Sequence, residues 1–324
     1  MSQLDMSGKR VLVTGGAGFL GQYVCRELRD REVAEVIVPR SRDYDLTVAS
    51  QVEQLFADTN PEIVIHLAAE VGGIGANRAN PGRYFYANMA MALHMIEASR
   101  VHGIRKFVQI GTVCAYPKHT PVPFCESALW SGYPEETNAP YGVAKKAALV
   151  MLQGYRQQYG VRGIYLLPGN LYGPHDNFDL ESSHVIPAMI RKFVDAADAR
   201  VPSVTLWGTG AASREFLFVE DCARAIVLAT ERYDSDEPIN VGSGQEIRIV
   251  RLAEKIRALV GYEGEIVWDA DMPDGQPRRC LDIRAAKEQF GFGATTSLEA
   301  GLRRTVEWWL QRHPSKRSKQ LGGA

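Results

Sequence analysis

The segment GGAGFLG at residues 15–21 constrains the fold of this chain more than any other, because it joins a short apolar run directly to an amphipathic stretch. Glycines allow a tight turn between a strand and a helix and let the backbone approach a bound group closely. Amide groups at the start of such a helix bind a pyrophosphate. An ordinary tight turn is the alternative, but the strand before it and the helix after it favour a dinucleotide-binding unit. The predicted cofactor contacts here are Gly15, Gly18, Phe19, Leu20 and Gly21.

Short apolar segments alternate with longer amphipathic ones along the first half of the chain. The apolar segments span residues 10–14, 35–38, 63–67, 106–111 and 163–168. They are apolar almost throughout, which is typical of strands that meet water on neither face. We therefore predict an α/β fold, with a Rossmann-type doubly wound parallel sheet and a smaller mixed α/β substrate domain at the C-terminal end.

The length of 324 residues exceeds what one hydrophobic core usually supports, so two domains are expected. We predict a dinucleotide-binding domain at 1–172, to which a segment at about 215–242 returns. The substrate-binding domain is predicted at 173–214 and 243–313, with helices at 185–199, 250–260 and 298–312. Residues 314–324 are basic and end in glycines, so we expect a mobile tail.

Charge and cysteine content exclude several functional classes. The chain carries 37 basic and 38 acidic residues, a formal net charge of -1, which gives no broad field to attract nucleic acid or a membrane surface. Its five cysteines are far apart without a Cys-x-x-Cys pair, so neither a disulfide framework nor a metal site is expected. No apolar run approaches the ~18 residues that span a bilayer. These features predict a soluble cytoplasmic protein without nucleic-acid or membrane partners.

The residues that follow the second apolar segment indicate which nucleotide binds. An acidic residue there would bind a ribose 2′-hydroxyl, whereas arginines would bind a 2′-phosphate. Arg40 and Arg42 occupy this place and favour NADP(H). The alternative is that both are solvated loop arginines, with Asp43 and Asp45 close by as competing partners.

Tyr141 and Lys145 lie four residues apart, which places them on the same face of a helix. The Lys145 ammonium can then approach the Tyr141 phenol and favour the phenolate by charge pairing. Thr112 follows the fourth apolar segment, and its hydroxyl can share the same substrate oxygen. Tyrosine and lysine at this spacing also recur on exposed helices. After a dinucleotide loop, however, they indicate a ketone or alcohol whose oxygen exchanges a proton while hydride moves at carbon.

Cys114 and His184 add a second kind of chemistry. A lone cysteine is most often a small buried hydrophobe, and a lone histidine most often an ordinary surface or core residue. Carbons beside a ketone, however, carry acidic protons. A thiol and an imidazole on opposite sides of such a carbon could remove one proton and return another, which inverts the stereocentre.

Several strings of residues are more specific than these single positions. They are VGGI (71–74), CAYPK (114–118), NLYGPHDNF (170–178), SHVIP (183–187) and PDGQPR (273–278). With them the chain resembles the extended short-chain dehydrogenase/reductase family. Within that family it is similar to the subgroup that epimerises GDP-4-keto-6-deoxy-D-mannose at C3 and C5 and then reduces it at C4.

The resemblance implies a role for each residue of the site. Tyr141 would donate the proton to the C4 oxygen, with Lys145 as its support and Thr112 as the hydroxyl partner. Cys114 and His184 would be the base and acid of epimerisation. Further implied cofactor contacts are Leu67, Ala68, Ala69, Lys145, Asn170 and His184, and implied GDP-sugar contacts are Asn170, Arg191, Trp207, Arg214 and Arg279. The resemblance also implies a homodimer that pairs helices near 88–102 and 141–159.

Two departures from the family pattern leave alternatives open. Thr112 replaces a common serine, which keeps the hydroxyl but stiffens its rotamer. Ala17 stands where relatives often have an arginine for the 2′-phosphate, so NADPH and NADH both remain open. A 4,6-dehydratase would need an acidic pair where Val113 and Cys114 stand. The other rivals are a 4-epimerase with tightly held NAD, a 3,5-epimerase without reduction, an enzyme for another GDP-4-keto sugar, and a dinucleotide sensor without turnover.

Overall fold

A six-stranded parallel sheet frames the N-terminal part of the protein, in a computed structural model that describes residues 3–272 and 274–314. The strands are β1 (Arg10–Thr14), β2 (Glu35–Ile37), β3 (Ile63–His66), β4 (Lys106–Ile110), β5 (Gly163–Pro168) and β9 (Pro238–Val241), in the order β2-β1-β3-β4-β5-β9. All five predicted strands are present, and three of them end one residue earlier than predicted. The chain runs from β1 to β2 on one side and returns to β3 on the other, which makes the ends of β1 and β3 the point where ligands bind in such sheets.

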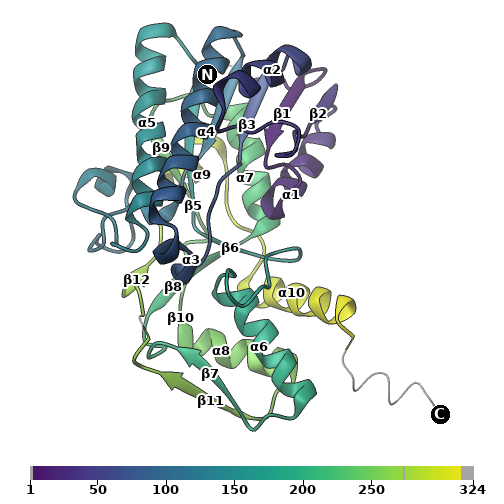
Figure 1. The fold of residues 1–324 in the computed structure, drawn as a ribbon, viewed down its shortest axis with the longest axis vertical. Helices are drawn as coiled ribbons and strands as arrows, with labels where there is room; N and C mark the ends of the chain where they lie inside the picture. The colour runs from purple at the N-terminus through teal and green to yellow at the C-terminus, as the bar shows by residue number, and fades with distance from the viewer. Residues whose placement is uncertain (1–2, 273, 315–324) are drawn as a thin grey trace, which may run out of the picture.

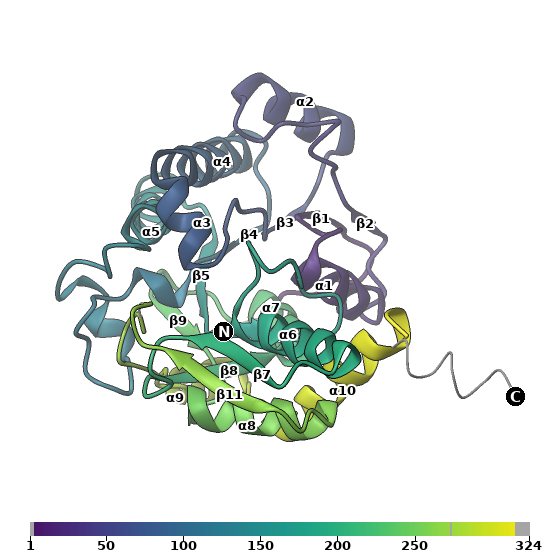
Figure 2. The same ribbon diagram turned by 60° about the horizontal axis from the view of Figure 1, so that its bottom comes forward.

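Helices cover both faces of this sheet. Figure 2 shows α2 (Ala49–Thr59), α4 (Pro81–Val101) and α5 (Ala139–Tyr159) on one face, and α1 (Phe19–Arg29) and α7 (Val219–Arg232) on the other. Side chains along each strand alternate between the two layers: Val11 and Val13 pack in one core cluster and Leu12 in the other. Burial on both faces explains why the strands are apolar throughout, and the predicted doubly wound α/β fold is confirmed.

A second group of elements lies beyond the carboxyl ends of the strands (Figure 1). Its strands are β6 (Asn170–Tyr172), β7 (Ser203–Trp207), β8 (Ser213–Phe218), β10 (Glu246–Arg248), β11 (Glu265–Asp269) and β12 (Arg278–Arg279). Its helices are α6 (Val185–Ala199), α8 (Ile249–Val260) and α10 (Leu298–Arg312), close to the predicted ranges. A separate apolar cluster holds these elements together, with Phe193, Leu206 and Ile256 among its members. None of the six strands in this group was predicted, and β6, β10 and β12 are only two or three residues long.

One stretch of the chain crosses back to the first sheet. After β8, α7 packs against α1, and β9 then pairs in parallel with β5. Helix α9 (Arg284–Phe290) contacts both β9 and α7. The domain boundaries themselves stay a prediction, and the expected tail at 314–324, apart from its first residue, lies outside the described residues. Over the part of the chain that is described, no helix combines the length and apolar character needed to cross a membrane.

We predict that two glycine substitutions have opposite effects on stability. A Cβ on Gly21 would lie 2.1 Å from the Gly15 carbonyl oxygen, so Gly21→Ala should lower the free energy of unfolding by about 1–3 kcal/mol or more. Gly82 lies in α4 with open space around it, so Gly82→Ala should raise that free energy by about 0.5 kcal/mol. Urea unfolding of both variants is the measurement. Equal midpoints would show that α1 does not need its close approach to the glycine turn.

Candidate active site

The glycine turn after β1 is shaped to receive a phosphate group. Gly15 has φ +70°, and a Cβ on it would lie 2.9 Å from the backbone nitrogen of Ala68, so the turns after β1 and β3 touch. Gly18 caps α1 without a side-chain hydrogen bond to the helix amides. Ala17 and Gly18 are exposed, so the first amides of α1 are accessible to an anion. This arrangement fits the diphosphate of a dinucleotide.

A buried histidine supports the glycine turn through a hydrogen bond with Thr14. The Thr14 hydroxyl lies 2.7 Å from Nδ1 of His66 and accepts a hydrogen bond of 3.2 Å from the Ala68 amide. Burial lowers the pKa of His66 to about 3, and the positive charge of Lys145 adds to the effect. His66 is therefore neutral and links β3 to β1. The predicted cofactor contacts Leu67, Ala68 and Ala69 follow it directly in the sequence.

The two arginines predicted to select the nucleotide lie in the loop after β2, and both are exposed. Nε of Arg42 is 3.6 Å from a carboxylate oxygen of Asp43. Ion pairs this exposed contribute little, so a 2′-phosphate can compete with Asp43 for the guanidinium. This geometry agrees with both alternatives, that the two arginines bind a 2′-phosphate or that they are solvated loop residues.

Close packing of α5 on the loop after β4 brings Tyr141 to Thr112. The loop contains a short 3-10 helix, η1 (Val113–Ala115). A Cβ on Gly142 would lie 2.6 Å from the carbonyl oxygen of Cys114, so only glycine permits this approach. Burial raises the pKa of Tyr141, the neighbouring Cys114 raises it further, and a hydrogen bond with Thr112 acts in the opposite direction.

Lys145 lies beside Tyr141 and also binds the backbone of β4. Its ammonium donates a 3.1 Å hydrogen bond to the carbonyl of Ile110 and lies 5.8 Å from the centre of the Tyr141 ring. Burial lowers the pKa of Lys145 to about 8. The expected stabilisation of the phenolate by Lys145 stays a prediction, because burial is the largest effect on the pKa of both groups in the free protein. The phenol is protonated and can donate its proton.

Cys114 is half-buried beside Arg279, which reaches it from β12. Nη1 of Arg279 is 3.6 Å from Sγ of Cys114 and 3.4 Å from Oδ1 of Asn170. Nε of Arg279 donates to Oε1 of Gln276 at 3.2 Å. The side-chain amide of Asn170 in turn donates a 2.8 Å hydrogen bond from Nδ2 to the backbone carbonyl of Glu215. Cys114 and Asn170 are thus connected through Arg279, and all three are predicted site residues.

His184 lies at the N-terminal end of α6, on the loop that faces the first domain. The ring contacts solvent, yet surrounding protein atoms desolvate it and lower its pKa, and the charge of Arg279 lowers it further. The Gly73 amide, from the loop after β3, donates a 3.2 Å hydrogen bond to the Ser182 carbonyl. The backbone just before His184 is therefore fixed to the edge of the main sheet.

Arg214 and Arg279 lie side by side, because β8 and β12 pair in a register that places them opposite each other. Burial lowers the pKa of Arg214 to about 10, and the charge of Arg279 adds to this effect. Arg214 donates to the Asp274 carbonyl at 2.9 Å. Two guanidinium groups that repel each other at close range are unfavourable without an anion, so this pair suits a diphosphate.

Arg191 and Trp207 are less closely tied to this cluster. Arg191 donates to the Phe178 carbonyl at 3.0 Å, and Trp207 is 55% exposed at the end of β7. Their contact with substrate stays a prediction. Sequence analysis missed Gln276 and Glu215, which hold Arg279 and Asn170. Gln276 lies in the specific string PDGQPR, so its position there was the one available signal.

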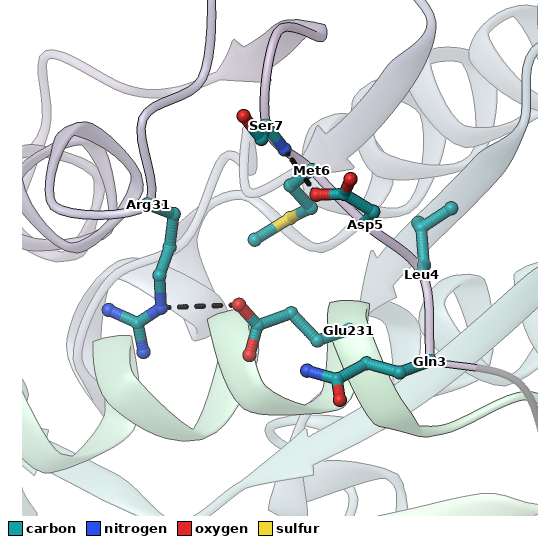
Figure 3. Close-up of a pocket in the computed structure, with 7 residues that line it drawn as sticks. All are labelled: Gln3, Leu4, Asp5, Met6, Ser7, Arg31 and Glu231. Atoms are coloured by element: carbon teal, nitrogen blue, oxygen red, sulfur yellow. Dashed lines mark hydrogen bonds and ion pairs between the residues drawn. The ribbon is translucent and has the colours of Figure 1, made fainter.

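A surface pocket elsewhere has no part in this arrangement. It has a volume of about 330 Å³ and is lined by Gln3, Leu4, Asp5, Met6, Ser7, Arg31 and Glu231 (Figure 3). Arg31 and Glu231 bond at 3.2 Å across it, from the ends of α1 and α7. Helix ends of this kind lie at the amino edge of a parallel sheet, opposite the edge that carries Tyr141.

Among the described residues, no three His, Cys, Asp or Glu side chains are grouped to hold a metal ion.

Comparison with known proteins identifies the family of the chain. A family model described as the NAD dependent epimerase/dehydratase family matches residues 11–242. The chain belongs to the NAD dependent epimerase/dehydratase family. This epimerase/dehydratase membership agrees with the resemblance to extended short-chain dehydrogenases/reductases.

Individual relatives match nearly the whole chain. A probable GDP-L-fucose synthase 1 of Oryza sativa subsp. japonica is 41% identical over 311 residues, which cover 96% of this chain and 94% of the relative. The GDP-L-fucose synthase of Escherichia coli (strain K12) is 39% identical and covers 94% of this chain and 98% of its own. The crystal structure of a GDP-L-fucose synthetase from Naegleria fowleri bound to NADP is 26% identical, with a TM-score of 0.87 over 98% of this chain and 97% of that chain.

His66 should make the stability of the protein depend on pH. Its pKa is about 3 when folded and about 6.5 when unfolded, so the unfolded chain takes up the proton first as pH falls. Stability is complete above the unfolded pKa and declines below it by about 1.4 kcal/mol per pH unit. His66→Gln should flatten this decline in urea unfolding between about pH 6.5 and 5. Exposed His119→Gln is the control, and equal slopes for the two variants would contradict the assignment.

Proposed function

We propose that the chain converts GDP-4-keto-6-deoxy-D-mannose into GDP-L-fucose, by epimerisation at C3 and C5 and NADPH-dependent reduction at C4. The observation that carries this proposal is the meeting of Cys114 with the buried Tyr141 and Thr112. A reductase alone needs a proton donor, but an epimerase also needs groups that exchange carbon-bound protons. The GDP-L-fucose synthases that are 39–41% identical to this chain support the choice of sugar.

The C4 ketone of the substrate acidifies the hydrogens at C3 and C5. Cys114 and His184 approach the sugar from different elements and exchange these hydrogens, which inverts both centres. The phenol of Tyr141 and the hydroxyl of Thr112 donate hydrogen bonds to the enolate oxygen at C4. When bound, NADPH supplies the hydride for reduction at C4. Tyr141, protonated because it is buried, then gives its proton to the C4 oxygen, and Lys145 holds the helix end in place through Ile110.

Each half of the reaction can be removed separately. Tyr141→Phe lacks the proton donor and should slow NADPH oxidation by about 100-fold or more, while deuterium still enters C3 and C5 from solvent. Cys114→Ser and His184→Gln should suppress deuterium entry, measured by NMR of the sugar. Normal deuterium exchange in Cys114→Ser would show that the thiol is not the base.

The identity of the product separates the rivals. Incubation with GDP-4-keto-6-deoxy-D-mannose and each reduced nicotinamide should consume NADPH stoichiometrically and yield GDP-L-fucose. Epimerised sugar without loss of NADPH would indicate a 3,5-epimerase, and turnover of a different GDP-4-keto sugar alone would indicate a related reductase. Absence of cofactor consumption with any ketone would indicate a sensor.

Arg40 and Arg42 should determine the preference for NADPH. Loss of one hydrogen-bonded charge at the 2′-phosphate costs about 1.5–3 kcal/mol, so Arg40→Ala or Arg42→Ala should raise the KM for NADPH about tenfold or more. The KM for NADH should stay the same. Parallel steady-state measurements with both cofactors test this, and equal changes for NADH would assign the arginines to the loop structure instead.

A homodimer through the outer sides of α4 and α5 is also part of this proposal. Leu93 on α4 is 43% exposed and Val150 on α5 is 52% exposed, and apolar side chains on two packed helices favour burial against a second copy. The five free cysteines suit a reducing cytoplasmic setting. Light scattering should give twice the mass of the chain, and Val150→Glu should lower it toward one chain.

A further inference from the structure

Arg279 is held in a single orientation before any substrate arrives. The residue is 8% exposed, and Gln276 fixes one edge of its guanidinium while Asn170 fixes Nη1. The remaining contact of Nη1 is Sγ of Cys114 at 3.6 Å. A planar guanidinium with two fixed edges cannot turn away from the sulfur without losing both hydrogen bonds. The contact is therefore built into the site.

The charged and titratable groups that act on Cys114 come from three elements. Arg279 approaches from β12, Arg214 from β8 and Tyr141 from α5. His184, at the start of α6, faces Arg279. Arg214 directs its guanidinium to the carbonyls of Ser213 and Asp274. Tyr141 is protonated and therefore neutral. Arg279 is thus the cation with a direct contact to the sulfur.

We propose that Arg279 is a positioning residue for epimerisation, which orients Cys114 and balances the negative charge of its thiolate. This role rests on the proposed function for its chemical purpose. In the step, the thiolate takes a proton from C3 or C5, so an S–H bond forms and a C–H bond breaks. The electron pair of that C–H bond forms the C=C bond of an enolate, and the π pair of the carbonyl moves onto the C4 oxygen, to which Tyr141 and Thr112 donate hydrogen bonds. Return of the pair and protonation of the carbon from the other side by His184 complete the inversion. Arg279 keeps all of its protons and stabilises the charged sulfur before the transfer.

The same cation acts on His184 in the opposite chemical sense. A positive charge favours a thiolate and disfavours an imidazolium. Removing Arg279 should therefore slow the reaction of Cys114 with an electrophile and raise the pH midpoint of His184. Arg279 thus acts on both groups that exchange carbon-bound protons.

The test uses the free full-length protein and needs no sugar. The rate of Cys114 alkylation by iodoacetamide is followed against pH, with the modified peptide quantified by mass spectrometry. Arg279→Met and Arg279→Gln should slow this alkylation by about tenfold at neutral pH, and NMR should show the His184 midpoint rising in the same variants. Arg279→Lys, which keeps the charge, should give a smaller change.

Arg278→Met is the matched control. Arg278 is the neighbouring residue in β12, but its exposed side chain pairs with Glu246 at 3.0 Å, so the alkylation rate of Cys114 and the His184 midpoint should stay at the wild-type values. An unchanged alkylation rate and His184 midpoint in a folded Arg279→Gln or Arg279→Met variant would overturn the proposal, and either variant suffices if the other does not fold. Slower alkylation and a raised His184 midpoint without turnover of any GDP sugar would refute the proposed function while confirming the contact. Normal turnover with an unchanged alkylation rate and His184 midpoint would refute the role of Arg279 alone.

Discussion

The contact between α5 and the loop after β4 is the constraint on which the rest of the site depends. It requires Gly142, because any side chain there would collide with the Cys114 carbonyl. Through it, a helix that carries Tyr141 and Lys145 and a loop that carries Thr112 and Cys114 come together. The buried phenol stays protonated, which suits it to give a proton when charge develops on that oxygen.

The second half of the molecule contributes the charged side chains that the main sheet lacks at the site. The main sheet provides the cofactor edge and the proton donor, whereas β8, β12 and the loop before α6 provide two guanidinium groups and an imidazole. Glu215 joins the halves, since its carboxylate accepts hydrogen bonds from the amides of Gly244 and Leu281, each at 2.7 Å. These hydrogen bonds hold the buried Glu215 in one position, and Glu215 in turn lies beside Arg214 and Asn170.

The sequence predicted the parts of this protein whose signals are local. The strand, glycine turn and helix around Gly15 follow from neighbouring residues, and the spacing of Tyr141 and Lys145 placed both correctly on α5. It could not predict the effect of Lys145 on the phenol, because that depends on how far each group is removed from water. Nor could it predict the prominence of Arg279, since the pairing of β12 with β8 joins residues 65 positions apart in the sequence, as 279 and 214. The fold was accessible from periodicity, whereas the electrostatics of the site needed coordinates.

A short helix outside the reacting groups ties both sides of the site together. Asn77, on α3 (Ile74–Ala79), donates to Oδ1 of Asn138 at the start of α5 and to the carbonyl of Gly72. The next residue, Gly73, is bonded to the segment that leads into His184. The segments that carry Tyr141 and His184 thus share one anchor, and this short helix holds them at a fixed spacing although they belong to different parts of the chain.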